Sequence, residues 1–253
     1  MNKTVKKVTF GPRVASAGCG LVLAILAIGC AVAPVEPPVP PPSFRLVVLD
    51  FRVPETWRDP LMLGQSSKEL QGWWFGSRKL WHNPGWGRVA GDTFSLELNH
   101  LPFVNLVSRV DIKYYMAEKN EQIHRVLDER RRKLEESTDP NDRQEAERIR
   151  QMSEADYERM LERLSPREIG RELNADRVLV GRIHDAYLAH NRTIHWYWSY
   201  MDLEVDLVDV GTGRVVWHRR APFKKSFASA SALLEAAARE MVEWMKIEYF
   251  YQP

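Results

Sequence analysis

Three segments near the C-terminal end of the chain have the hydrophobic patterns of β-strands. Residues 177–188 are rich in β-branched and aliphatic side chains, which suit a partly buried pleated surface. Across residues 201–207, apolar side chains alternate with acidic ones, as expected of a strand with one buried and one solvated face. Residues 214–220 follow Gly211-Thr212-Gly213, whose two glycines can adopt the positive φ values of a tight hairpin. The pattern predicts a three-stranded antiparallel meander.

The segments around the meander predict the rest of an α/β domain. Residues 44–51 form an apolar run suited to a central strand, and residues 229–249 form an alanine-rich helix with an apolar stripe that would cover one face of the sheet. The other predicted elements are helices over 88–101 and 111–134, a strand over 103–108, and a short helix with a capping box that begins at Ser165-Pro166-Arg167-Glu168. This order predicts one compact, three-layer-like domain over residues 44–253. Its helices would pack on a mixed sheet that ends in the antiparallel meander.

Residues 54–87 are a tryptophan-rich loop without a regular pattern. The loop contains Trp73, Trp74, Trp81 and Trp86 among glycine, proline, serine and asparagine. Aromatic side chains with a polar edge are typical of membrane interfaces and partner surfaces. Alternatively, the indoles pack together and fold the loop back onto the sheet. Both interpretations stay open at this point.

A second aromatic group lies just before the alternating strand. If the strand extends back to them, Ile194, Trp196, Trp198 and Tyr200 share one of its faces. We predict that this face contacts a bilayer interface or a partner protein, and the alternative is burial beneath the tryptophan-rich loop.

Residues 117–164 are a charged helical insertion. Glu, Asp and Arg dominate its second half, and residues 139–142 (DPND) predict a turn between two helices with a thin apolar seam. Such charge runs are usually solvated helix faces, and the more specific hypothesis is an arm that contacts a neighbouring subunit. Acidic residues interleave with basic ones throughout, so we expect no nucleic-acid partner.

The N-terminal residues have the pattern of an export leader. Residues 1–13 carry four cations and no acid, and residues 14–28 are apolar. The leader ends in Leu26-Ala27-Ile28-Gly29-Cys30, which resembles the lipobox of bacterial lipoproteins, so we predict a signal peptide over 1–29 and lipidation of Cys30. Three alternatives stay open: cleavage after Ala33, an uncut membrane-spanning helix over 14–32, and modification of Cys19.

A proline-rich linker follows the predicted lipidation site, over residues 30–43. Its run APVEPPVPPP is extended at ~3 Å per residue and would hold the domain about 30 Å from the anchor. The two cysteines of the chain are Cys19, in the leader, and Cys30, the predicted lipidation site, so the mature domain offers neither a disulfide nor a cysteine nucleophile. Without the four leader cations, the 36 basic residues become 32 against 34 acidic ones, so the mature protein is slightly acidic.

Candidate chemistry in the predicted domain is sparse. The sequence has no phosphate loop, dinucleotide-binding glycine pattern or HExxH motif. His184, His190 and His195 are close in sequence, but only Asp185 joins them, and their spacing distributes them over two strands and a turn. We therefore predict solvent-facing histidines, no metal site, no cofactor and no enzymatic activity.

Several short motifs are distributed over the predicted domain. They are Ile169-Gly170, Leu173, Ala175-Asp176, residues 178–183 (VLVGRI), Leu207-Val208-Asp209 and residues 212–217 (TGRVVW), with residues 96–98 and 103–112 upstream. Together they resemble the CsgG/LpoB-like group of bacterial envelope lipoproteins, except that Ser108 stands at an acidic position of the group. The resemblance covers residues 44–245 apart from the tryptophan-rich loop and the charged insertion. It is carried by core and turn residues, which are more specific for fold than for function.

The resemblance and the leader together imply a function in the cell envelope. We predict a non-catalytic, oligomeric lipoprotein that acts as a scaffold or accessory component of an outer-membrane export or surface-assembly system. Its partners would be the membrane, through the lipid, and envelope proteins of that system, and Ala31 after the cysteine fits sorting to the outer membrane, facing the periplasm. The first alternative is a lipoprotein regulator of a peptidoglycan synthase, against which the short linker counts. The second is an enzyme of unknown type that uses His184 and Asp185.

The predicted contact residues come from both aromatic groups. They are Trp73, Trp74, Trp81, Trp86, Trp196, Trp198 and Tyr200.

Overall fold

A computed structural model describes residues 41–57, 69–71, 76–80, 83–191 and 196–251 of the 253-residue chain. The chain divides into two units, Met1–Pro38 and Val39–Pro253, and all described residues belong to the second. The predicted leader, Cys19, Cys30 and most of the linker therefore lie outside the described residues. None of the helices in the described part of the chain has the length and apolar character needed to cross a bilayer.

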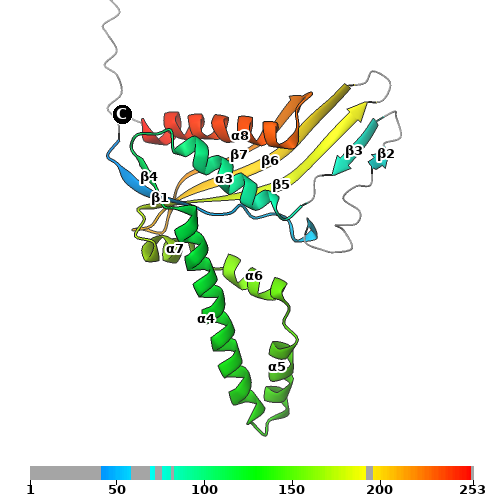
Figure 1. Cartoon of the computed structure of the whole chain (residues 1–253), viewed down its shortest axis with the longest axis vertical. Coiled ribbons are helices and arrows are strands. Elements are labelled where there is room, and N and C mark those ends of the chain that lie inside the picture. The colour runs from blue at the N-terminus through cyan, green and yellow to red at the C-terminus, as the bar shows by residue number, and fades with distance from the viewer. Residues whose placement is uncertain (1–40, 58–68, 72–75, 81–82, 192–195, 252–253) are drawn as a thin grey trace, which may run out of the picture. The chain divides into compact units, whose positions relative to one another are not determined.

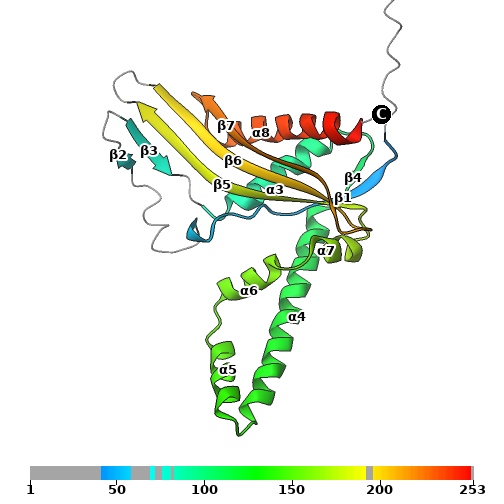
Figure 2. The same cartoon turned by 180° about the vertical axis from the view of Figure 1, so that it is seen from behind.

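The domain is built on a seven-stranded mixed sheet (Figures 1 and 2). Strand β1 lies between β4 and β5 and is parallel to both, whereas β5, β6 and β7 form an antiparallel meander. One edge of β5 pairs with β6 along its length, while its other edge pairs first with β1 and then with β3. The strands are β1 (Phe44–Val48), β2 (Glu69–Gln71), β3 (Gly76–Leu80), β4 (Val104–Leu106), β5 (Arg177–Asn191), β6 (Trp196–Asp209) and β7 (Val215–Ser226).

Helices cover both faces of the sheet, which confirms the predicted α/β fold with three layers. Helices α3 (Trp86–Leu98) and α8 (Ala230–Met245) enclose the larger core on one face, together with the odd-numbered residues of β6. On the other face, α7 (Pro166–Glu172) and the first turns of α4 (Arg109–Glu135) enclose a smaller core around Val178. The remaining elements are η1 (Glu55–Trp57), α5 (Pro140–Arg150), α6 (Glu154–Glu162) and the π-helical turn η2 (Lys246–Phe250).

The meander has the predicted strands, but they are longer than the sequence pattern indicated. β5 continues to Asn191, and β6 begins at Trp196. A β-bulge interrupts the β5–β6 register between Ile183 and Asp185, so His184 is the additional residue. In the turn before β7, only Gly213 has a positive φ, of 74°. Gly211 does not, because the Asp209 carboxylate shapes this turn by accepting hydrogen bonds from the backbone N–H and the hydroxyl of Thr212 at 2.6 and 2.8 Å.

The motif residues have structural roles in this fold. The Asp176 carboxylate accepts a hydrogen bond of 2.7 Å from the backbone N–H of Arg45, which fixes β1 beside β5. A Cβ on Gly170 would lie 2.3 Å from Val210, so α7 can approach the sheet only because this position has no side chain. The predicted capping box at Ser165 and Glu168 is present at the start of α7.

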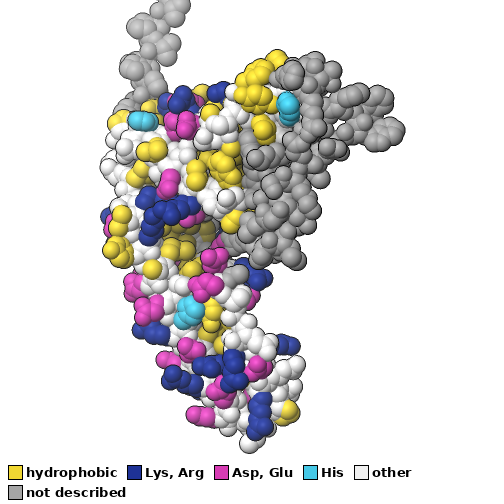
Figure 3. Space-filling model, turned by 45° about the vertical axis from the view of Figure 1, so that its right-hand side comes forward, with side chains coloured by type: hydrophobic (Ala, Val, Ile, Leu, Met, Phe, Trp, Pro, Cys, Tyr) yellow, Lys and Arg dark blue, Asp and Glu magenta, His cyan; other side chains and the backbone are white. Residues whose placement is uncertain are grey.

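The charged insertion contains three helices where two were predicted. Its first part is the remainder of α4, and α5 and α6 pack along that helix. The second predicted helix is interrupted because Ser153 forms a capping box with Asp156 and starts α6 after a short break. Ion pairs join α4 to α5 at Arg130–Glu145 and Arg150–Glu135, with distances of 2.6 and 2.8 Å. Basic and acidic side chains interleave over this part of the surface (Figure 3).

Candidate functional site

The face of β5, β6 and β7 that points away from α3 and α8 is here called the outer face. Ser199, Met201 and Leu203 of β6 are fully buried on the α8 side. Because side chains alternate along a strand, Trp196, Trp198 and Tyr200 lie on the outer face, as the sequence predicted. Trp196 remains 42% exposed at the end of the hairpin. The outer face therefore offers an aromatic surface at this end of the sheet.

Each of these aromatic side chains has a defined neighbour. The Tyr200 ring stacks on the Tyr187 ring with centroids 4.7 Å apart, and the Lys224 ammonium lies 4.6 Å from the centre of the Trp198 ring. Trp196 meets the ring of Phe227 edge-on at 4.7 Å. Burial, followed by the nearby Asp202 carboxylate, raises the pKa of the Tyr200 phenol. These contacts hold the aromatic side chains in one arrangement, which is the condition for a preformed contact surface.

The other predicted contact residues are not part of this surface as described. Trp86 starts α3 and packs, half-buried, against the larger core. Trp57 is 2% exposed and belongs to the same core. Trp73, Trp74 and Trp81 lie outside the described residues, as do Ile194 and the predicted lipidation site Cys30.

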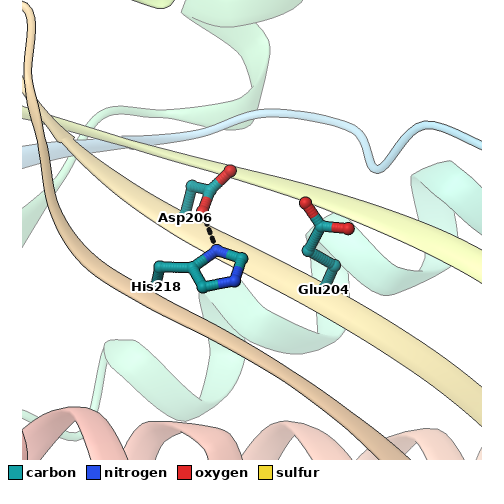
Figure 4. Close-up of side chains that lie close together, drawn as sticks. All are labelled: Glu204, Asp206 and His218. Atoms are coloured by element: carbon teal, nitrogen blue, oxygen red, sulfur yellow. Dashed lines mark hydrogen bonds and ion pairs between the residues drawn. The ribbon is translucent and has the colours of Figure 1, made fainter.

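A row of charged side chains continues the outer face beyond the aromatic surface (Figure 4). Asp202 pairs with Arg220 at 2.7 Å. The next two carboxylates pair with histidines of the neighbouring strands: Glu204 with His184 at 2.5 Å and Asp206 with His218 at 2.6 Å. Three strands therefore contribute ionisable groups to one strip of the outer face.

The pKa of Glu204 shows the balance of forces in this strip. Partial burial raises the pKa of the carboxyl group, but the hydrogen bond and charge of His184, followed by the charge of Arg182, outweigh it and lower the pKa overall. The neighbouring Arg220 has a raised pKa because it donates a hydrogen bond to Asp202. Both groups are therefore charged at neutral pH.

The sequence did not bring these residues together. In the sequence, His184 lies close to His190 and His195. In the structure, the alternation of side chains along β5 places His190 on the side opposite the outer face, and His195 lies outside the described residues. The sequence pattern did not indicate that Glu204, Asp206 and His218 lie on the same strip as His184. The alternating acids of the predicted strand were visible, but their partners became apparent only through the register of β5 and β7.

A cavity of about 420 Å³ lies at the carboxyl end of β1. The connections from β1 and β4 leave to opposite faces of the sheet, towards α3 and α4, and such a topological switch point commonly forms a binding crevice. Apolar side chains from the segment after β1 and from α4, α6, α7 and β5 line it, together with several charged groups. Lining residues include Leu49, Phe51, Ile112, Leu161, Val180, Arg88, Lys113 and Glu158.

Arg109 ties three elements together at this cavity. Its guanidinium donates to the Val48 carbonyl oxygen at 2.7 Å and to the Asp92 carboxylate at 2.8 Å, and it also pairs with Asp50. The arrangement fixes the middle of α3 and the start of α4 to the end of β1. Because the carboxylates of Asp50 and Asp92 already neutralise this guanidinium, Arg109 has a positioning role.

The sequence matches no protein-family model and no curated protein. The structure is similar to lipoprotein GNA1162 from Neisseria meningitidis (12% identity, TM-score 0.42), with 81% of this chain and 99% of that chain covered. It is also similar to the PelC dodecamer from Paraburkholderia phytofirmans (10% identity, TM-score 0.32, coverage of 81% and 89%). The LpoB C-terminal domain from Escherichia coli is a further similar structure (14% identity, TM-score 0.28, coverage of 73% and 84%). Bacterial lipoproteins are thus among the similar structures, but TM-scores below 0.5 assign this chain to none of their families.

Proposed function

We propose that this protein is a non-catalytic lipoprotein of the bacterial envelope that acts as an oligomeric scaffold or accessory component of an outer-membrane export or surface-assembly system. The leader supports the location, because its apolar run ends in Ile28-Gly29-Cys30 and is followed by a proline-rich spacer. The motifs at residues 169–183 and 207–217 support the resemblance to envelope lipoproteins.

The observation that carries the proposal is the aromatic surface of β6. Trp196 is 42% exposed, and Trp198 and Tyr200 lie beside it on the same face. Rigid aromatic side chains contribute a large contact area at low entropic cost and are enriched at protein interfaces. The surface therefore suits contact with a neighbouring subunit or an envelope partner.

Two experiments with the full-length protein test the proposal. In the first, membranes from cells with the natural chain and with Cys30→Ser are fractionated, and we expect the serine variant to leave the outer-membrane fraction. In the second, the protein is extracted in mild detergent, its mass is measured and co-purified proteins are identified. We expect an oligomer with an envelope partner, and a monomer without partners would overturn the proposal.

A surface variant connects the result to the aromatic surface. Trp196→Ser combined with Trp198→Ser should abolish the association while leaving the melting temperature nearly unchanged. The matched control is Leu96→Ser on α3, which removes an apolar side chain that is 68% exposed elsewhere on the domain. Equal loss of association in both variants would show that the aromatic surface has no special role. Specific co-purification of a peptidoglycan synthase would support the regulator function instead.

A further inference from the structure

We propose that His184, Glu204, Asp206 and His218 form a binding site for Zn²⁺ on the outer face. These residues lie on three adjacent strands, and the proposed envelope function does not use them. The proposal is therefore independent of that function.

The geometry of three of these groups is close to that of a metal site. Asp206 and His218 are directly opposite each other across β6 and β7, and Glu204 lies two residues along on the same face of β6. One ligand atom from each of the three lies within 4.8 Å of the others. Ligand atoms around tetrahedral zinc lie at about 2.0–2.2 Å from the metal, and hence about 3.4 Å from one another. To coordinate the ion, the three side chains must move by about 1 Å, which rotation about side-chain bonds allows.

The fourth ligand would come from His184, which lies outside the three-residue group and would have to turn towards it. It is the additional residue of the bulge in β5, and its Nε2 atom lies 2.5 Å from the Glu204 carboxylate. Bulges commonly re-aim a side chain next to a functional site. The bulge thus directs the imidazole of His184 to the carboxylate of Glu204, which lies on the same face as Asp206 and His218.

The local charge favours a divalent cation. Among the described residues of the strip, the three carboxylates of Asp202, Glu204 and Asp206 lie beside two guanidinium groups, so these five groups carry one excess negative charge when both imidazoles are neutral. The side chains of His184, Glu204 and Asp206 are only 22–26% exposed, which strengthens their interaction with a bound ion relative to open solvent. The two guanidinium groups are those of Arg182 and Arg220.

The ligand set selects the class of metal. Two imidazoles with two carboxylates suit Zn²⁺, whereas Ca²⁺ and Mg²⁺ prefer sites made entirely of oxygen atoms. In the described arrangement each histidine pairs with one carboxylate. A zinc ion would replace these two hydrogen bonds by metal–ligand bonds and bring positive charge to the acidic strip.

The test is titration of the untagged full-length protein, in detergent micelles, with ZnCl₂ in a calorimeter. We expect one zinc ion per chain, and a rise in melting temperature with zinc because the ion binds only the folded state. His218→Ala and Glu204→Gln should each weaken binding more than about tenfold, by loss of a ligand. The matched control is His100→Ala, an exposed histidine after α3, which should bind as the natural chain does.

Cobalt substitution gives a second measurement that reports the coordination itself. Co²⁺ added to the natural chain should give the visible absorption of a tetrahedral site with nitrogen and oxygen ligands, and His184→Ala should change that spectrum. Melting curves without metal establish that each variant is folded, and if one variant is not, the others decide the question. Absence of zinc binding by the natural chain, or binding that survives all three ligand changes, overturns the proposal.

Discussion

Phe51 packs its ring directly over Gly181, and this contact joins the segment after β1 to the middle of β5. A Cβ on Gly181 would lie 2.2 Å from the ring, far closer than carbon atoms approach in proteins. Phe51 is 3% exposed and also packs against Phe94 of α3 at 4.8 Å between ring centres. A shift of the ring towards Phe94 would therefore disturb α3.

We expect Gly181→Ala to lower the free energy of unfolding by about 1–3 kcal/mol, the usual cost of forcing additional atoms into a packed core. Urea denaturation followed by circular dichroism measures the loss. Combining the change with Phe51→Leu supplies the control, because a smaller side chain makes room for the new methyl group. The double variant should be more stable than the sum of the two single effects, by about 1 kcal/mol. Strict additivity would show that the two residues do not compete for the same space.

The contact between Gly181 and Phe51 shows which features of a single residue can be predicted from the sequence. Gly181 lies within an apolar strand, a position at which glycine permits close packing or a bulge, and close packing is what it has. The identity of the packing residue was not predictable, because Phe51 lies 130 positions earlier and no local pattern connects them. For the same reason His184, Glu204, Asp206 and His218 could be assigned to one strip only after the register of three strands was known.

The turn between β6 and β7 depends on one carboxylate. Asp209 has a lowered pKa, first because its carboxylate accepts the backbone hydrogen bond from Thr212, then because it accepts the Thr212 hydroxyl, and also because Arg177 is close. Its ionised form is therefore favoured in the folded protein. The same three-residue turn places β7, and with it His218, beside β6.

We expect Asp209→Asn to lower the free energy of unfolding by about 1 kcal/mol at neutral pH, because the charged acceptor is lost. The folded pKa of Asp209 lies below its ordinary value of 3.8, so its stabilisation is complete above that pH. The stabilisation disappears as the pH falls through the folded pKa, where the folded carboxylate also takes up a proton. The difference between natural chain and variant, measured by denaturation from pH 7 to pH 2, should shrink towards zero at the acidic end. A difference that is constant across this range would contradict the role of the charge.

At the scale of elements, the sequence predicted what is encoded locally. The alternation of residues 201–207 and the apolar stripe of α8 correspond to β6 and its covering helix, since both patterns follow directly from strand and helix periods. The break between α5 and α6 was missed although Ser153 and Asp156 form a capping box there, because two short polar helices resemble one long one. The extensions of β5 to Asn191 and of β7 to Ser226 were also missed, since pairing with β3 and β6 supports them.

The charged insertion is separate from both cores of the domain. The larger core and the smaller core contain no residue from 117–163, so burial that holds the sheet together does not depend on this segment. Within the insertion, Ala146 and Ile149 are buried against α4, and the rings of His124 and Tyr157 stack. The surface ion pairs between α4 and α5 contribute little each. The insertion is therefore an accessory to the fold.

Shortening the insertion tests this separation for the whole molecule. The rings of His124 and Tyr157 stack with centroids 3.6 Å apart, so residues 125–156 connect two positions that already touch. Replacing residues 125–156 with a glycine-serine linker of about six residues spans this gap. We expect the shortened chain to keep its β-sheet signal and to unfold cooperatively with nearly the same midpoint, because both cores are intact.

The same variant distinguishes a solvated arm from an intersubunit arm. If the insertion contacts a neighbouring copy, the mass of the shortened protein in mild detergent should fall from that of the oligomer to that of a monomer, whereas Arg148→Ala, a single change on the exposed face of α5, should leave the mass unchanged. If the mass of the shortened protein is unchanged, the contacts between subunits lie on the domain itself. Substitutions in the aromatic surface around Trp196 would then be the next test. Loss of cooperative unfolding would instead show that α5 and α6 belong to the folding unit, because the smaller core would then need them to keep α4 in place against the sheet.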